Sequence, residues 1–255
     1  MTSPSPSERT PSFYHARRVS APGTIALTFA GVLVIYLVQI AAAPLIGMLP
    51  AAALSYIVIS LVVWKTSRDL KFSLGVTGAR ARFWIAAVLI GLSVWLLDLA
   101  IVDLLKPRST STTLATTVAN EQLWATLPVL ALCPAIGEEL LFRGVLVRGL
   151  ANRPGWRWIA VGVSAIVFST YHLDPPQIVG TLLIGIALAT LATGARSIVP
   201  GMVAHALNNT VVLLLARGKL APVVTAMSDY PDITLVTCTG MFLAGIALCV
   251  REVKS

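Results

Sequence analysis

The chain has 255 residues, of which 56% are hydrophobic and only 12% are charged. A soluble globular domain carries about 25% charged residues, so this composition, with its repeated apolar stretches, indicates an integral membrane protein. The net charge of +8 does not indicate a nucleic-acid-binding protein, because the basic residues lie between apolar segments and form no stripe with interleaved aromatic residues.

Residues 1–23 are rich in Pro and Ser, and we expect them to form a disordered cytoplasmic tail. Residues 24–255 are expected to form a single transmembrane domain. Its apolar segments predict eight membrane-spanning helices at about 24–43, 46–65, 83–105, 121–148, 157–173, 177–194, 197–216 and 232–250. The first segment resembles a signal sequence, but it is long for one and many spans follow, which favours an uncleaved span. The expected fold is therefore all-α and polytopic.

The distribution of Lys and Arg predicts the orientation of these spans. Of the 19 basic residues, 14 fall on the side of the N-terminal tail, 4 fall on the opposite side, and Arg143 lies within a span. Basic residues accumulate on the cytoplasmic side of membrane proteins, so both termini are expected in the cytoplasm. The short loops and small size favour the inner membrane of a bacterial cell. The three cysteines lie in or beside apolar segments and indicate neither a disulfide framework nor a metal site.

A short set of polar residues lies within or beside the predicted spans. They are Asp98, Asp103, Glu121, Glu138, Glu139, Arg143, His172, His205, Asn208 and Asn209. A charge at the centre of a membrane helix costs roughly 2.5–3.5 kcal/mol, so each deep group needs a partner or a function. Asp103 and Glu121 lie near span ends and are expected to be solvated. Asp98 lies deeper and is expected to be a structural hydrogen-bond partner.

The stretch "GEELLFR" at 137–143 holds three of these charges. Glu139 and Arg143 are four residues apart with the acid first, which is the favourable order for a helical ion pair. Glu138 lies about 100° further round the helix, so Arg143 is not expected to serve both acids. A carboxylate without a cationic partner is free to accept a proton, as a general base does. Glu138 is therefore the candidate base.

Two histidines fall within predicted spans. His172 follows Phe168 by four residues, and His205 precedes Asn209 by four, so each pair is expected on one helix face. A single intramembrane histidine is usually a packing residue. Two histidines, an asparagine and an unpaired glutamate on separate helices indicate instead one site, reached from the cytoplasmic half of the membrane.

These residues form three ordered motifs: Glu138-Glu139-x-x-x-Arg143, Phe168-x-x-x-His172 and His205-x-x-x-Asn209. Together they resemble the CAAX protease and bacteriocin-processing (CPBP, or ABI) family, the group of type II CAAX prenyl endopeptidases and intramembrane glutamate proteases. The segment 182–209, "LLIGIALATLATGARSIVPGMVAHALNN", is also similar to this family. The resemblance covers residues 120–216, which would be the catalytic core.

The resemblance implies an intramembrane endopeptidase that acts on a membrane-associated peptide or protein without a metal or another cofactor. Glu138 and His172 would activate a water molecule, while His205 and Asn209 would stabilise the oxyanion. Glu139 and Arg143 would support the site, and Phe168 would orient His172. The family name implies prenylated substrates, but no feature of the sequence shows a prenyl pocket.

Two alternatives remain open. Glu138, His172 and His205 could form a zinc site, although the chain has no H-E-x-x-H motif. A non-enzymatic membrane protein, such as a transporter, a scaffold or an immunity factor, could carry the same residues. A transporter would normally show paired halves with broken helices, and the sequence shows no such symmetry.

Overall fold

The computed structural model of the chain describes residues 19–69, 73–109 and 121–250. Within these ranges every regular element is a helix. Seven passes of the bundle are each a single continuous helix: α1 (Ala21–Ile46), α2 (Met48–Asp69), α3 (Ala81–Leu105), α8 (Arg157–Thr170), α9 (Pro175–Ala195), α10 (Val199–Ala216) and α12 (Pro231–Val250). A short helix, α11 (Ala221–Asp229), precedes α12. A further pass is built from the consecutive segments α5 (Leu123–Leu127), η2 (Pro128–Leu132), α6 (Cys133–Glu138), η3 (Glu139–Val147) and α7 (Arg148–Ala151). The predicted all-α polytopic fold is confirmed.

Seven passes in the described part of the chain are long and apolar enough to cross a membrane. The expected span at 157–173 is the exception, because α8 has only 14 residues and ends at Thr170. At 1.5 Å per residue it measures about 21 Å, less than the roughly 30 Å of a bilayer core. The chain then turns through Leu173, with a φ of 59°, and Pro175 begins α9. The predicted span was three residues too long, and His172 lies in this turn.

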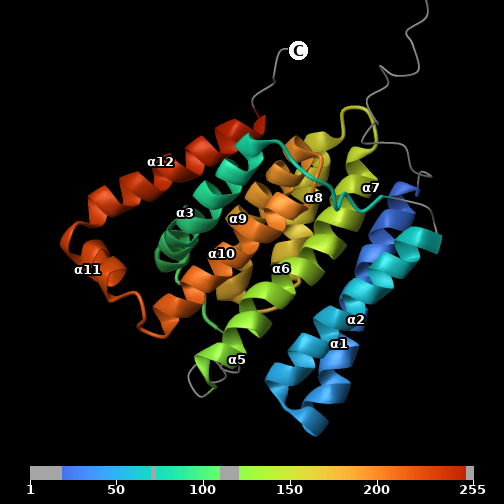
Figure 1. Ribbon diagram of the computed structural model, residues 1–255, viewed down its shortest axis with the longest axis horizontal. Coiled ribbons are helices and arrows are strands. Elements are labelled where there is room, and N and C mark those ends of the chain that lie inside the picture. Colours follow the sequence, from blue (N-terminus) through green and yellow to red (C-terminus); the bar gives the residue numbers. More distant parts are fainter. Residues whose placement is uncertain (1–18, 70–72, 110–120, 251–255) are drawn as a thin grey trace, which may run out of the picture.

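Successive passes run in alternate directions, so residues 19 and 250 lie at the same end of the bundle (Figure 1). Hydrogen bonds at this end join segments that are far apart in the sequence. Arg153 Nη2 donates to the carbonyl of Val19, and the N–H of Ile198 donates to the carbonyl of Gly75. Loops that the charge distribution assigns to one side therefore meet in space. That this side is cytoplasmic remains a prediction.

The pass from Leu123 to Ala151 departs from α-helical geometry in two π-helical stretches, η2 and η3. Pro134 has no N–H, so the carbonyl of Leu130, four residues earlier, lacks its α-helical donor. Glu138 is the last residue of α6 and Glu139 is the first of η3. The two acids thus lie where the helix changes its winding, and π-helical turns are frequent at functional sites.

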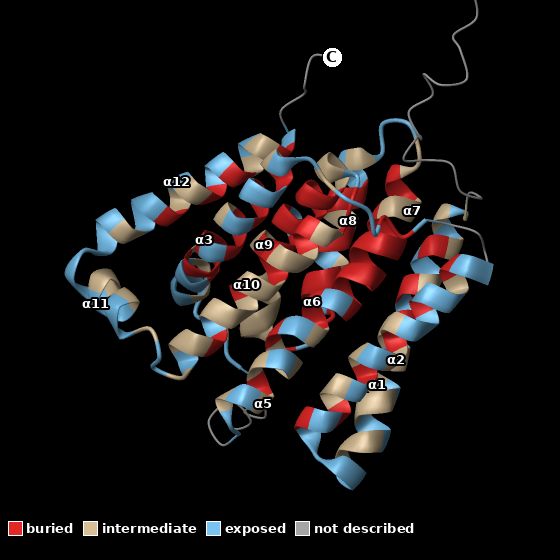
Figure 2. Ribbon diagram, in the orientation of Figure 1, coloured by how far each residue is buried: buried red, intermediate tan, exposed pale blue. Residues whose placement is uncertain are grey.

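Glycines allow close packing between the passes. A Cβ at Gly91 of α3 would lie 2.5 Å from the carbonyl oxygen of Ala204 in α10, and a Cβ at Gly31 of α1 would lie 2.5 Å from Leu141 in η3. Small residues are typical of membrane helix interfaces, because lipid gives no hydrophobic driving force and close backbone contact supplies van der Waals attraction. Figure 2 shows that burial concentrates on the central helices around η3 and α9, whereas α12 is largely exposed.

Substitution of Gly91 tests the contact between α3 and α10. We expect Gly91→Ala to lower the free energy of unfolding by about 1–3 kcal/mol, because the added Cβ would overpack against Ala204. Gly240→Ala in α12 is the matched control, since no described atom lies within 4 Å of a Cβ there. Unfolding of both variants in detergent micelles measures the difference. Equal stability of the two variants would contradict the close contact.

Candidate active site

The predicted ion pair between Glu139 and Arg143 is present and lies at the centre of the bundle. Arg143 Nη1 is 2.9 Å from Glu139 Oε1, and both side chains are fully buried. Arg143 Nη2 also donates to the carbonyl of Gly185 in α9, at 3.2 Å, and the guanidinium lies 4.3 Å from the ring centroid of Phe168. Gly201 of α10 leaves room for the pair, because a Cβ there would lie 2.9 Å from Glu139 Oε2.

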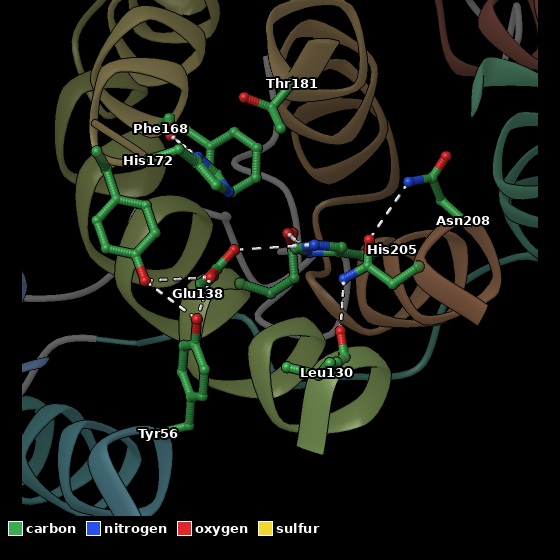
Figure 3. A network of polar contacts seen from close by, with 12 residues as sticks. Tyr56, Leu130, Glu138, Phe168, His172, Thr181, His205 and Asn208 are labelled. Atoms are coloured by element: carbon green, nitrogen blue, oxygen red, sulfur yellow. Dashed lines mark hydrogen bonds and ion pairs between the residues drawn. The ribbon is translucent and has the colours of Figure 1, made fainter. Parts of the chain in front are cut away.

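Glu138 is also buried, with 2% of its surface exposed, but Arg143 does not pair with it. Its Oε1 accepts a hydrogen bond from the Tyr56 hydroxyl at 2.7 Å and another from the Tyr171 hydroxyl at 3.3 Å (Figure 3). Its Oε2 is buried and has no hydrogen-bond partner among the described residues. The nearest basic atom to Oε2 is His205 Nε2, at 3.8 Å. Glu138 is thus the acid without an arginine, as the sequence predicted, but one of its oxygens is occupied.

The two tyrosines were not predicted from the sequence. Tyr171 directly precedes His172, and this adjacency was the one signal available for it. Tyr56 lies on α2, 82 residues before Glu138, and no motif spacing connects the two. The hydroxyls of Tyr56 and Tyr171 are themselves 3.1 Å apart.

His172 lies beyond the end of α8 and is held through its Nδ1, which is 3.0 Å from the carbonyl oxygen of Phe168. A carbonyl only accepts hydrogen bonds, so Nδ1 carries the proton and Nε2 keeps its lone pair in the neutral ring. The rings of Phe168 and Tyr171 contact the imidazole edge to face, at centroid distances of 5.2 and 5.0 Å. His172 is therefore connected to Glu138 through Tyr171.

His205 lies between the two carboxylates. Its Nδ1 is 3.1 Å from Glu139 Oε1, and its Nε2 is the atom that faces Glu138 Oε2. Glu139 is already paired with Arg143, so its carboxylate accepts and His205 Nδ1 donates. The ring of Phe168 packs against His205 at 5.8 Å between centroids. The structure thus brings His205 to Glu138, and it adds a bond to Glu139 that the sequence did not predict.

Asn209 lies one turn after His205 on α10, and its side chain points to the helix that carries the two acids. Its Nδ2 donates to the carbonyl of Leu130 at 3.4 Å, and its Oδ1 accepts from Asn208 Nδ2 at 3.3 Å (Figure 3). The Leu130 carbonyl is the one that Pro134 leaves without an α-helical donor. An amide nitrogen has two protons, so Asn209 keeps one N–H beyond this bond.

Asp98, the deep acid of α3, was expected to form a structural hydrogen bond. Asp98 is buried in α3, but its Oδ1 has no hydrogen-bond partner among the described residues, so the structural bond expected for it is not observed at this atom. Within residues 19–69, 73–109 and 121–250, no group of three or more His, Cys, Asp or Glu side chains is arranged to hold a metal ion.

Part of the chain matches a known protein family. Residues 120–211 match the family model described as "Type II CAAX prenyl endopeptidase Rce1-like". No curated protein and no solved structure gives a match. The matched segment includes all three motifs and excludes α1, α2, α3, α11 and α12.

The match confirms the resemblance inferred from the motifs. Residues 120–211, about a third of the chain, are thus similar to the type II CAAX prenyl endopeptidases. Its apolar helices make it a protein of the lipid bilayer.

Loss of the buried arginine tests the structural role of the ion pair. We expect Arg143→Met to lower the free energy of unfolding by about 3–5 kcal/mol, because it leaves the Glu139 charge buried without its cation. The double variant Glu139→Gln/Arg143→Met should be more stable than Arg143→Met alone, since it removes that charge as well. Unfolding in detergent measures both variants. A double variant that is less stable than the single one would contradict this account.

Proposed function

Starting from the family match of residues 120–211, we propose that the chain is an intramembrane endopeptidase that uses Glu138 as its general base. The observation that carries the proposal is the difference between the two oxygens of the Glu138 carboxylate. Oε1 is held by two tyrosine hydroxyls, whereas the buried Oε2 has no hydrogen-bond partner among the described residues. The buried Oε2 of Glu139 also has no hydrogen-bond partner among the described residues, but Glu139 is paired with Arg143 and Glu138 is not, so Glu138 is the acid that remains to accept a proton.

In the proposed reaction, water donates one proton to Glu138 Oε2, and its oxygen bonds to the carbonyl carbon of the peptide. The C=O electron pair moves to the oxygen, which becomes the oxyanion of a tetrahedral intermediate. The intermediate then collapses as the C–N bond breaks, and the proton on Glu138 passes to the leaving nitrogen. His172 assists, because its Nε2 has a lone pair that can accept a hydrogen bond from the attacking water.

His205 and Asn209 are proposed to stabilise the oxyanion. His205 Nδ1 is committed to Glu139, so the ring can donate from Nε2 only when it carries both protons. Asn209 supplies the N–H that it does not use on Leu130. One donor to an oxyanion is worth roughly 2.7–4 kcal/mol where it has been measured.

Glu139, Arg143 and Phe168 are proposed to support the site without touching the substrate. Glu139 orients His205, and Arg143 neutralises Glu139. Phe168 holds His172 through its carbonyl and packs its ring against both histidines.

The substrate is proposed to be a membrane-associated peptide or protein, because the acids lie in a pass of membrane-spanning length. The charge distribution supports cytoplasmic termini, and the small size supports a bacterial inner membrane. The description of the matched family model names a CAAX prenyl endopeptidase. Prenylation of this chain's own substrate is not part of the proposal.

A comparison of peptide termini tests the proposed activity. Membranes are prepared from cells that carry the wild-type protein, Glu138→Ala or no protein, and their peptide termini are identified by mass spectrometry. We expect a set of new termini with the wild type alone, and these termini would name the substrate. Identical termini in all three samples, with the wild type expressed and folded, would favour a non-enzymatic protein. Loss of cleavage on treatment with a chelator, restored by zinc, would favour the zinc alternative.

Two isosteric substitutions test the assignment of roles. We expect Glu138→Gln to lower the cleavage rate by about 10²–10⁴-fold, because the amide keeps the shape but cannot accept the proton. Glu139→Gln should lower the rate much less, since Glu139 acts through His205 and Arg143. The rate at which the wild-type-specific termini appear, divided by the amount of folded protein, measures both effects. Equal losses in two well-folded variants would overturn the assignment.

A further inference from the structure

Two tyrosines from separate parts of the chain contact Glu138, and a third tyrosine contacts one of them. Tyr36 lies on α1, Tyr56 on α2, and Tyr171 in the turn after α8. The Tyr36 hydroxyl donates to the carbonyl of Tyr171, and the rings of these two residues lie 5.7 Å apart between centroids. The hydroxyls of Tyr56 and Tyr171 both reach Glu138 Oε1. All the hydrogen-bond donors to Glu138 in the described part of the chain are thus tyrosine hydroxyls on one of its oxygens.

The distances rank the two donors. Each hydroxyl has a single proton to donate. Tyr56 is 2.7 Å from Glu138 Oε1, the length expected for a hydrogen bond to a charged oxygen, whereas Tyr171 is 3.3 Å away. Tyr56 is therefore the main donor. Tyr171 is the weaker one, because the Tyr56 hydroxyl, 3.1 Å away, is a second acceptor for its single proton. Because both act on Oε1, they fix the rotation of the carboxylate and leave Oε2 pointing towards His205 (Figure 3).

The packing around the tyrosines leaves them little freedom. Tyr56 lies against Gly137, where a Cβ would be 2.9 Å from Cδ1 of its ring, so only glycine lets the ring approach the helix this closely. Tyr171 is held at its carbonyl by Tyr36, and its ring lies 5.5 Å from that of Phe142. The hydroxyls are thus placed by rigid contacts before any substrate binds.

We propose that Tyr56 and Tyr171 are positioning residues for Glu138, so that the α1–α2 hairpin completes a site whose other residues all lie in the matched segment. The proposal rests on the proposed function, in which Glu138 is the base. The tyrosines act through the carboxylate: they anchor Oε1 and present Oε2 to the attacking water. An anchored oxygen reduces the reorientation needed when the proton is transferred.

Removal of single hydroxyls tests the proposal. The variants are Tyr56→Phe and Tyr171→Phe, with Tyr230→Phe as the matched control, because Tyr230 lies between α11 and α12 and is 61% exposed. The measurement is the rate at which the wild-type-specific termini appear in isolated membranes, per folded protein, over a series of pH values. Glu138→Gln is included in the same series.

We expect Tyr56→Phe to lower the rate about tenfold, as for the loss of one hydrogen bond to a charged group, and Tyr171→Phe to lower it less. Both should also displace the pH–rate profile along the pH axis, because each removes a hydroxyl that hydrogen-bonds to the carboxylate of the base. The other ionisable groups around Glu138 are unchanged in these variants: Tyr36, His172, His205 and the Glu139–Arg143 pair. A loss that is only structural would lower the whole profile without displacing it, and it would lower the melting temperature.

The outcomes separate this proposal from the one on which it rests. An active Glu138→Gln protein, or a wild type that produces no new termini, would overturn the proposed function. An inactive Glu138→Gln protein beside a Tyr56→Phe protein with the rate and profile of Tyr230→Phe would overturn the positioning role and leave the proposed function standing.

Discussion

The arrangement of the site depends on how one buried arginine divides two adjacent carboxylates. Arg143 pairs with Glu139, and His205 from α10 donates to the same carboxylate oxygen. An isolated charge inside a membrane is costly, so this cluster holds the acidic helix and α10 together. The same pairing leaves Glu138 without a cation at hydrogen-bond distance. The two acids are adjacent in the sequence, yet the Glu139 carboxylate is neutralised by its neighbours and the Glu138 carboxylate is not.

The helix that carries the two acids makes a second polar contact with α10, at its π-helical stretch η2. Backbone groups inside a membrane need partners within the protein, because neither water nor lipid can supply them. Pro134 removes the α-helical donor for Leu130, and Asn209 donates to that carbonyl instead. Helix α10 therefore meets the acidic helix twice, through His205 and, one turn later, through Asn209. Of these two residues, His205 also faces Glu138, with its Nε2 3.8 Å from Oε2.

The matched segment and the observed site differ in extent. Residues 120–211 hold the acids, His172, His205 and Asn209, but the shortest hydrogen bond to Glu138 comes from Tyr56, outside that segment. The α1–α2 hairpin reaches the acidic helix through glycines at 31 and 137, which remove the bulk that would hold the helices apart. A family relationship confined to the core is thus compatible with a site that the preceding helices help to build.

The sequence by itself determined the all-α membrane fold, the approximate position of each pass and the Glu139–Arg143 pair. These features are local: an apolar run is long enough to span a bilayer, and an i,i+4 spacing brings two side chains together on any helix. Only the tertiary structure decided that α8 stops at Thr170, that His205 bonds to Glu139 and that Tyr56 binds a carboxylate 82 residues away. Such contacts depend on the rotation and depth of each helix. Packing against neighbouring helices sets both, and no spacing within one segment encodes them.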